Sequence, residues 1–378
     1  MSAGLGAFPA MERDELSAWL RLLETPQVGR GSARKLLAAF GSPHAVLAAP
    51  TAARRELVSA ETAAALAEVP DAVTALVDAT IQWLSDAQEG SPRQMLTLGD
   101  PSYPPLLLET ADPPLLLYLQ GNASLLAAHS LAVVGSRNPT PQGTENARSF
   151  STHLSQAGMT IVSGLALGVD GAAHEGGLTG PGRTVAVVGT GLDRVYPRRH
   201  LDLARRIASH GLIVSEYSLG TPPLPPNFPM RNRIIAGLTR GTLVVEAALQ
   251  SGSLITARLA SEAGRDVFAI PGSIHSPQSR GCHALIKQGA KLVDSAQDVL
   301  EELPPQGFFA SSFTEPTPVP QNDDPLLHAL GFDPVTLDAL VARTGWPAPL
   351  LNTRLLELEL AGQVARLPGQ LFQRVRAT

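Results

Sequence analysis

The most constraining feature of this sequence is a regular alternation of short apolar runs and helical stretches between residues 131 and 302. Seven runs are almost entirely apolar, which is typical of strands buried on both faces; they are 131–134, 159–162, 184–188, 212–214, 242–245, 266–270 and 291–293. The stretches between them predict helices at 141–157, 168–178, 198–209, 251–263, 283–288 and 296–302. This alternation predicts a doubly wound α/β fold, a parallel sheet with ligands at the carboxyl ends of its strands.

The sequence before this core has a different pattern. With 378 residues, the chain is long enough for two or three domains. Residues 11–87 are rich in Ala and have apolar residues at helical spacing, which predicts an N-terminal helical domain over 1–90, of the SAM or helix-hairpin type. The composition shifts to Gly, Ser, Pro and Asp around 88–105, and we therefore place the start of the α/β domain, 91–302, in this stretch.

The C-terminal part predicts a linker and a third domain. Residues 303–325 are polar and rich in Pro, which indicates a linker. Residues 326–378 show two helices followed by a short hairpin, a winged-helix pattern. Many winged helices bind duplex DNA through their second helix. Here that helix carries Arg354 beside Glu357 and Glu359, so duplex binding, protein contact and a structural role all stay open.

Charge and cysteine content limit the classes of protein to consider. The net charge is −5, yet residues 131–300 hold 16 basic and 11 acidic residues, so an acidic chain has a basic middle that can bind a polyanion on one face. Cys282 is the only cysteine, which excludes an internal disulfide and a Cys-rich zinc site. No apolar run approaches the ~18 residues that span a bilayer, and the N-terminus lacks a secretory pattern, so we expect a cytoplasmic protein without membrane contact.

Two strand ends predict anion-binding turns. Gly135, Ser136 and Arg137 follow the first strand and open onto a helix, where backbone N–H groups stabilise an anion and Arg137 can add a bidentate phosphate contact. Ser251 and Ser253 open a later helix in the same way. The alternative is an ordinary capping turn with a surface arginine.

The segment 222–238 is the most informative block. We interpret it as a Pro-stiffened loop that presents Phe228 beside Arg231, Asn232 and Arg233. Stacking of a base on Phe228, with the two arginines on phosphates, uses each residue type for its strongest interaction. Either arginine could instead brace the loop from the interior.

Several catalytic and cofactor classes find no support. The loop after the third strand has Arg194 where a dinucleotide-binding motif needs its third Gly, and the chain contains no phosphate-binding G-x-x-x-x-G-K-[ST] sequence. The nine histidines show no metal-ligand spacing, and Cys282 has no recognisable base, so we expect neither cofactor nor metal nor catalytic residue. For Asp170 and His174, four residues apart, we favour a structural hydrogen bond between the two side chains over an acid–base pair.

Six blocks of the core, taken together, resemble the DprA family, also called Smf. In order they are GSR, SGLALGVDGAAH, GTGLDRVYP, NFPMRNRIIAGL, VVEAALQSGSLITA and AIPGSIHSPQSRGCHALIKQGAKLV, within residues 95–300. The resemblance implies an extended Rossmann-like domain without nucleotide-dependent catalysis. It also implies a recombination mediator of natural transformation that binds and protects incoming single-stranded DNA and loads RecA onto it, displacing or accommodating single-strand-binding protein.

The same resemblance assigns residues. The DNA site would contain Gly135, Ser136, Arg137, Phe228, Arg231, Asn232 and Arg233, with Arg198, Arg199 and Lys287 as further basic candidates beside Ser251 and Ser253. A homodimer surface would contain His283, Ile286 and Leu292, with RecA contacted close by. Leu167 and Pro225 stand where many members carry a basic residue, and each departure removes a possible phosphate contact.

Two other functions remain as alternatives. A Rossmann-like phosphoribohydrolase acting on nucleoside monophosphates would use a P-G-G-x-G-T-x-x-E sequence. This chain keeps Gly241, Thr242 and Glu246 but lacks the leading Gly-Gly and shifts the Glu. An adaptor that works mainly through its winged helix is the third possibility.

Overall fold

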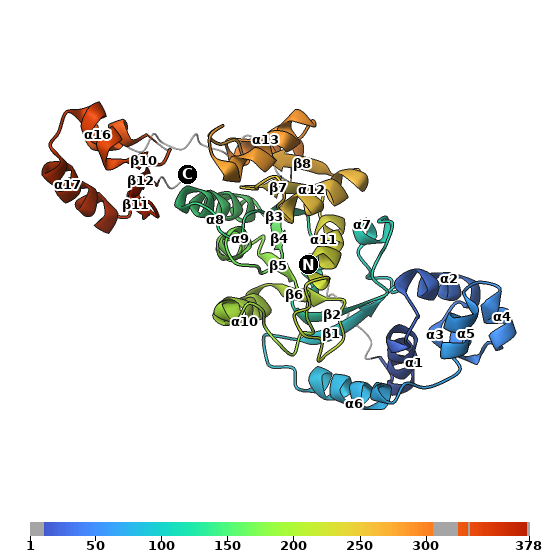
Figure 1. The fold of residues 1–378 in the computed structure, drawn as a ribbon. Coiled ribbons are helices and arrows are strands. Elements are labelled where there is room, and N and C mark those ends of the chain that lie inside the picture. Colours follow the sequence, from blue (N-terminus) through green and yellow to red (C-terminus); the bar gives the residue numbers. More distant parts are fainter. Residues whose placement is uncertain (1–10, 305–323, 332, 376–378) are drawn as a thin grey trace.

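A nine-stranded sheet forms the centre of the molecule. The computed structural model describes residues 11–304, 324–331 and 333–375; most of the predicted linker at 303–325 lies outside the described residues. The strand order is β1-β2-β6-β5-β4-β3-β7-β8-β9, and Figure 1 shows helices on both faces of this sheet. The α/β class predicted from the alternating pattern is therefore confirmed.

All seven predicted strands are present, and they are mutually parallel. They are β3 (Ser130–Val134), β4 (Thr160–Ser163), β5 (Thr184–Val187), β6 (Leu212–Ser215), β7 (Gly241–Val244), β8 (Asp266–Ala269) and β9 (Lys291–Leu292). Strands β3 to β7 are buried at every position, because helices cover both of their faces. This double burial explains why their sequences are continuous apolar runs.

Two further strands extend the sheet at one edge. β1 (Arg93–Thr97) and β2 (Leu116–Gly121) pair antiparallel, and β2 pairs antiparallel with β6. Our sequence interpretation missed both, since β1 lies within the stretch read as a boundary. β1 begins with polar residues whose packing is local: the Arg93 guanidinium lies 5.1 Å from the centre of the Trp83 ring.

The helices of the α/β domain form two layers. One face of the sheet is covered by α8 (Pro141–Gln156), α9 (Val169–Gly177), α10 (Leu201–His210) and α14 (Ala296–Glu302). The other face is covered by α7 (Pro105–Leu108), α11 (Asn227–Leu238), α12 (Ser253–Glu262) and α13 (Arg280–Lys287). Helix α11 was not predicted, because its segment opens with prolines and was interpreted as a loop.

The N-terminal helices pack directly on the antiparallel edge of the sheet. They are α1 (Arg13–Glu24), α2 (Arg30–Phe40), α3 (Pro43–Ala48), α4 (Thr51–Arg55), α5 (Ala60–Ala65) and α6 (Ala72–Ser85). Their apolar core includes Met95 from β1 and Leu116 and Tyr118 from β2. The rings of Trp83 and Tyr118 meet edge to face at 5.9 Å, so burial of the helical domain depends on the sheet edge.

A partly buried ionic cluster adds a polar connection between these two parts. Arg30 and Arg34 of α2 pair with Asp112, and Arg30 also lies 3.6 Å from Glu216, which follows β6. Arg233 of α11 pairs with both carboxylates, 2.9 Å from Asp112. The side chains of Arg233 and Glu216 are only 11% and 6% exposed, so their charges depend on each other for compensation.

We predict that Arg233→Met lowers the free energy of unfolding by about 3 kcal/mol, because it leaves the Glu216 carboxylate buried without its closest cation. Urea denaturation of the full chain measures the loss. The matched control is Arg13→Met, which breaks an ion pair whose side chains are 57% and 58% exposed and should cost less than about 1 kcal/mol. Equal losses for both variants would contradict the cluster's structural role.

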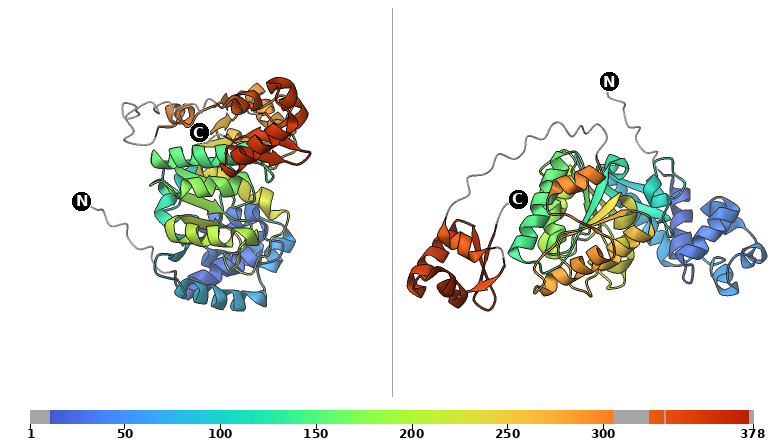
Figure 2. Two further views of the ribbon diagram at one scale, coloured as in Figure 1. Left: turned by 90° about the vertical axis from the view of Figure 1, so that its left-hand side faces the viewer. Right: turned by 90° about the horizontal axis from the view of Figure 1, so that it is seen from above.

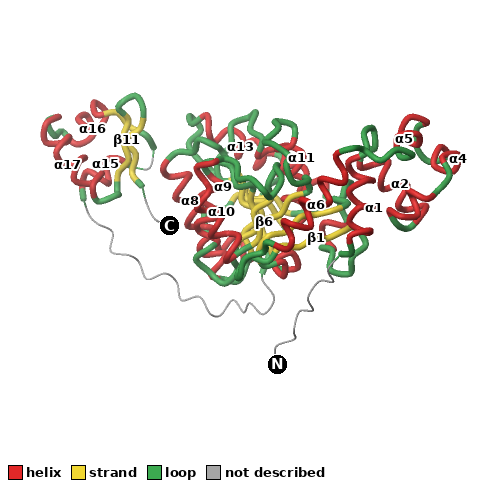
Figure 3. Tube along the Cα trace, turned by 90° about the horizontal axis from the view of Figure 1, so that it is seen from below, coloured by secondary structure: helices red, strands yellow, loops and turns green. Residues whose placement is uncertain are grey.

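The C-terminal domain is a winged helix, as predicted. It contains α15 (Pro325–Leu330), α16 (Leu337–Thr344) and α17 (Ala348–Leu360), and its sheet has the order β10 (Val335–Thr336), β12 (Leu371–Arg374), β11 (Val364–Leu367). Figures 2 and 3 show it at the opposite end of the molecule from the N-terminal helices. Arg354, the basic residue of α17, pairs with Asp324 at 2.6 Å and Glu357 at 2.5 Å, so its charge is locally compensated.

Candidate nucleic-acid interface

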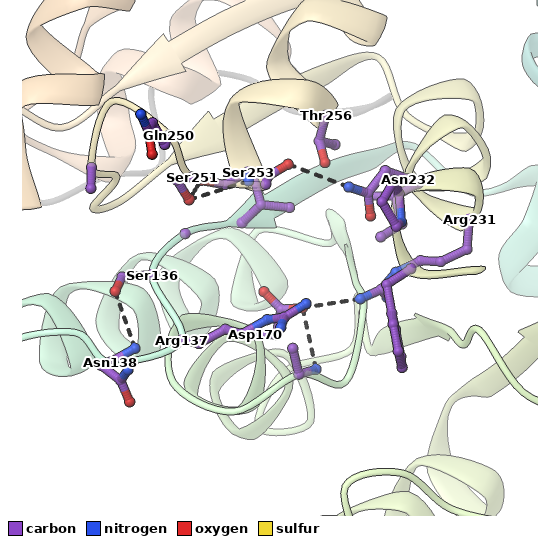
Figure 4. A pocket seen from close by; sticks show the side chains of 18 of the residues that line it. Ser136, Arg137, Asn138, Asp170, Arg231, Asn232, Gln250, Ser251, Ser253 and Thr256 are labelled. Atoms are coloured by element: carbon purple, nitrogen blue, oxygen red, sulfur yellow. Dashed lines mark hydrogen bonds and ion pairs between the residues drawn. The ribbon is translucent and has the colours of Figure 1, made fainter. Parts of the chain in front are cut away.

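A pocket of about 470 Å³, lined by both polar and apolar side chains, opens at the carboxyl edge of the sheet, where the strand pattern predicts a ligand. The loops after β3, β4 and β7 and the first turns of α11 and α12 form its walls. Eight predicted site residues line it together: Gly135, Ser136, Arg137, Phe228, Arg231, Asn232, Ser251 and Ser253. In Figure 4, Ser251, Ser253 and Thr256 lie on one side of the pocket and Arg137 and Asp170 on the other.

Close backbone packing explains the glycines of the first loop. A Cβ atom on Gly135 would lie 2.7 Å from Val169 Cγ2 and 3.0 Å from the Glu246 carbonyl oxygen. Gly168 has a φ of +82°, and a Cβ there would lie 2.4 Å from the Ser136 carbonyl oxygen. The two glycines therefore allow the loops after β3 and β4 to touch, which brings Arg137 to the rim of the pocket.

Arg137 is a cation at the pocket whose partners differ from those of the buried arginines. Within the described residues it forms no ion pair, and its guanidinium carbon lies 5.8 Å from the centre of the Phe228 ring. A guanidinium at this distance from a ring is held by a weak cation–π contact and keeps its hydrogen-bond donors free. Arg137 can therefore bind a phosphate without first breaking an ion pair.

Phe228 lies on a helix, and our interpretation of its segment as a loop was wrong. It is the second residue of α11, whose N-cap is Pro226 and whose third residue is Pro229. Proline is tolerated in the first turn of a helix, where the N–H groups have no intrahelical acceptor. The helix holds the half-buried Phe228 ring at the pocket, 5.5 Å from the ring of Tyr196.

Arg231 braces the pocket from within. Its side chain is 5% exposed; Nη1 donates to the Val187 carbonyl oxygen at 2.5 Å, and Nη2 lies 3.9 Å from Asp170 Oδ2. Desolvation by burial lowers the pKa of Arg231 and raises the pKa of Asp170, while the attraction between the two charges opposes both shifts. The interior role that the sequence left open for an arginine therefore belongs to Arg231.

Arg233 does not line the pocket. It sits in the ionic cluster with Asp112 and Glu216, two residues further along α11 from Arg231. The structure thus separates the two arginines that the sequence interpretation placed together on phosphates. Both are buried and paired, so neither offers a free guanidinium to a polyanion.

Asp170 and His174 do not bond to each other, which corrects our expectation. Asp170 accepts hydrogen bonds from the backbone N–H groups of Gly164 and Ala166, at 3.1 and 3.3 Å. His174 Nε2 accepts from the Leu165 N–H at 3.2 Å, and its Nδ1 lies 2.7 Å from Thr184 Oγ1. Both side chains hold the same loop in place, and desolvation lowers the pKa of His174 to about 3.

This burial predicts an acid-sensitive fold. His174 stays neutral in the folded chain, whereas the unfolded chain takes up its proton below a pKa of about 6.5. Its contribution to stability is therefore complete above that pH and is lost as the pH falls toward 3. Between pH 7 and pH 5, the free energy of unfolding of the native chain should drop by about 2 kcal/mol more than that of His174→Gln. Parallel pH profiles in urea denaturation would contradict this assignment.

The opposite wall presents hydrogen-bonding groups at the start of α12. Ser251 Oγ and Ser253 Oγ lie 2.6 Å apart, and Asn232 Nδ2 donates to the Gly252 carbonyl oxygen at 3.4 Å. The sequence interpretation missed other polar side chains of this lining: Asn138, Asp170, Gln250, Thr256 and Gln278. The signal for Gln250 was its place directly before the Ser-Gly-Ser turn, but nothing in the sequence placed Gln278 here.

The remaining predicted residues lie outside the pocket. Arg198 and Arg199 are exposed on the 3₁₀ turn η2 (Arg198–His200), and Lys287 is exposed at the end of α13. The three residues predicted at a dimer surface lie on α13 and β9: His283, Ile286 and Leu292. Leu292 is 47% exposed, and His283 Nε2 lies 2.9 Å from the Gly272 carbonyl oxygen.

Glu246 is the residue that the phosphoribohydrolase alternative would use as its carboxylate. In the structure it bonds to Thr140, the N-cap residue of α8. Its carboxylate accepts hydrogen bonds from the Thr140 N–H at 2.9 Å and the Thr140 hydroxyl at 2.6 Å, at the start of α8. Burial raises its pKa, and it is not among the residues that line the pocket. The arrangement fits a structural carboxylate at a helix N-terminus.

The described residues contain neither a membrane-spanning helix nor a metal-binding cluster. No described helix is long and apolar enough to cross a membrane. No group of three or more His, Cys, Asp or Glu side chains in the described parts of the chain is arranged to hold a metal ion.

These features define a three-part protein: a Rossmann-like sheet with an arginine-bearing pocket at its carboxyl edge, flanked by a helical domain and a winged helix. The chain belongs to the DNA recombination-mediator protein A family, whose model matches residues 94–304. Residues 313–370 match the DprA winged helix domain, and residues 13–75 match the DprA-like N-terminal HHH domain.

Individual relatives agree with this assignment. Protein Smf of Escherichia coli is 43% identical over 311 residues, covering 80% of this chain and 82% of its own. DNA processing protein DprA of Streptococcus pneumoniae is 52% identical over 203 residues, 54% of this chain and 72% of its own. The X-ray structure of S. pneumoniae DprA superposes with a TM-score of 0.66 at 39% identity, covering 76% of this chain and 98% of that one.

A second solved structure concerns single-stranded DNA. It describes the single-stranded DNA binding mode of DNA processing protein A from Helicobacter pylori. It superposes on this chain with a TM-score of 0.52 at 31% identity, covering 58% of this chain and 97% of that one.

Proposed function

We propose that this protein is a cytoplasmic, non-enzymatic recombination mediator that binds incoming single-stranded DNA during natural transformation, protects it and loads RecA onto it. The observation that carries the proposal is Arg137, which has no ion pair within the described residues, over the Phe228 ring at a pocket rich in polar side chains. A phosphate and an unstacked base each find a suitable partner there within one nucleotide's reach.

The same arrangement favours single strands over duplex. In a duplex, neighbouring bases cover both faces of each base, so a protein ring at a pocket can stack only on a base that has left the helix. The hydroxyl and amide groups of Ser251, Ser253, Asn232 and Gln250 can bond either to base edges or to phosphate oxygens. A pocket of this composition suits a nucleotide without demanding one particular base.

Relatives support the same class of ligand. The H. pylori protein, 31% identical over the aligned part, is described by its single-stranded DNA binding mode. From the family resemblance we further propose a homodimer through the surface of His283, Ile286 and Leu292, with RecA contacted close to it. In this scheme, single-strand-binding protein is displaced or accommodated.

Two positions of this sequence differ from the family pattern, and each difference removes a possible contact with a phosphate. Leu167, 36% exposed, and Pro225 stand where many family members carry cations. The exposed Arg198 and Arg199, which form no ion pair in the described chain, can compensate for this loss. We therefore include them in the DNA-binding surface, while Lys287 remains a candidate at its border.

Phe228→Ala should weaken binding of a single-stranded oligonucleotide by about 1–3 kcal/mol, the usual loss for one stacked base. Phe228→Tyr keeps the ring and should bind nearly as tightly as the native chain. Fluorescence anisotropy at one salt concentration measures all three proteins. An unchanged affinity for Phe228→Ala would remove the ring from the DNA site.

Arg137→Ala should lower both the affinity and its dependence on salt, because one phosphate fewer is neutralised. For single strands, the slope of log K against log salt should shrink by about 0.7. Titrations at several salt concentrations give this slope. A variant with lower affinity and the native slope would show that Arg137 supports the pocket without touching a phosphate.

The overall proposal is tested by comparing single- and double-stranded oligonucleotides of one sequence in mobility shifts, with and without RecA. We expect preference for the single strand and faster RecA filament formation on DNA that carries this protein. Equal binding of both DNA forms, unaffected by changes to residues 131–300, would favour an adaptor that works through its winged helix.

A further inference from the structure

Beyond the pocket, an exposed aromatic side chain lies against Phe228. Tyr196 belongs to the loop between β5 and α10 and is 49% exposed, while Phe228 is half-buried. The two ring centres are 5.5 Å apart and the rings are tilted by 39°. A large aromatic side chain held at the surface by a second ring has little conformational freedom to lose on binding.

The surroundings of Phe228 leave Tyr196 as the more accessible ring. The Arg137 guanidinium lies 5.8 Å from the centre of the Phe228 ring, and Tyr196 contacts the same ring. With both neighbours in place, Phe228 offers less free surface to a base than Tyr196 does. A strand that leaves the pocket past Phe228 therefore meets the Tyr196 ring next.

Positively charged side chains follow Tyr196 in the sequence. Arg198 and Arg199 follow Tyr196 by two and three residues; both are exposed and have no ion pair within the described segments. Arg194, on the other side of Tyr196, is instead paired with Asp193 at 3.1 Å. Among the described residues, the exposed cations without an ion pair thus follow Tyr196 in the sequence, and a phosphate backbone beside them would find the higher positive potential.

The strand order of the sheet gives the route. The pocket is built by the loops after β7, β3 and β4, and the next strand in the sheet is β5, whose loop carries Tyr196. All four strands are parallel, so these loops emerge at one edge and form a continuous path.

We propose that Tyr196 is a second stacking platform for single-stranded DNA, which takes the nucleotide next to the one at Phe228 and passes its phosphates to Arg198 and Arg199. This inference rests on the proposed function and extends it to a subsite outside the pocket. The strand then crosses the carboxyl edge in the order β7, β3, β4, β5.

The first test uses the full chain and a length series of oligothymidylates from about six to about twenty nucleotides. Tyr196→Ala should bind the long oligonucleotides about tenfold more weakly and the shortest almost normally, because only longer strands reach the second ring. Tyr196→Phe should behave as the native chain at every length. No loss with Tyr196→Ala at any length would overturn the proposal.

The same series separates stacking from mere support of Phe228. If Tyr196 only held the Phe228 ring in place, Tyr196→Ala would weaken the shortest strands as much as Phe228→Ala does, and the proposal would fail. In strands with 2-aminopurine at successive positions, the native chain should change the fluorescence of two adjacent bases. Tyr196→Ala should lose one of these two changes and keep the other.

The charge part of the path has its own control. Arg198→Gln and Arg199→Gln should each reduce the salt slope for long strands by about 0.7. Arg55→Gln replaces an exposed arginine of α4 in the N-terminal domain and should leave the slope unchanged. Native slopes in both η2 variants would remove these residues from the path.

The experiments also distinguish failure of the proposed function from failure of this inference. If the native chain showed no preference for single strands, the proposed function itself would fail. Losses with Phe228→Ala but none with Tyr196→Ala would reject only this inference.

Discussion

The buried contact of Arg231 with Asp170 and the Val187 carbonyl oxygen is the interaction on which the geometry of the pocket depends. It ties α11 to the end of β5 and to the first turn of α9, and Asp170 in turn holds the backbone N–H groups of the loop at Gly164 and Ala166. Because a buried charge without a partner is costly, this network allows one arrangement of helix and loops. The pocket is a consequence of that arrangement.

The arginines near this contact are of two kinds. The side chains of Arg231 and Arg233 are largely buried and pair with carboxylates, so these ion pairs stabilise the position of α11. Arg137, Arg198 and Arg199 have no ion pair in the described part of the chain and lie at the pocket or on the loop beyond it. A protein of net charge −5 can therefore present a cationic path without a large excess of basic residues.

The same helix also connects the pocket to the N-terminal domain. Arg233 joins Asp112 and Glu216, and through them Arg30 and Arg34 of α2, two residues along α11 from the brace at Arg231. The antiparallel edge strands add an apolar contact through Tyr118 and Trp83. The helical domain is thus part of the structure that positions α11, whereas the winged helix has a core of its own.

The sequence by itself determined the parallel sheet, because a strand buried on both faces must be apolar throughout, and it determined which loops carry Gly, Ser and Arg at the carboxyl edge. The sequence also predicted that eight of the residues that line the pocket belong to one site. Local pattern misled at α11, where prolines that normally break helices sit in the one turn that accepts them. Only the tertiary structure decided which arginines are free: residue type is the same at Arg137, Arg231 and Arg233, and burial beside a carboxylate depends on segments far apart in the chain.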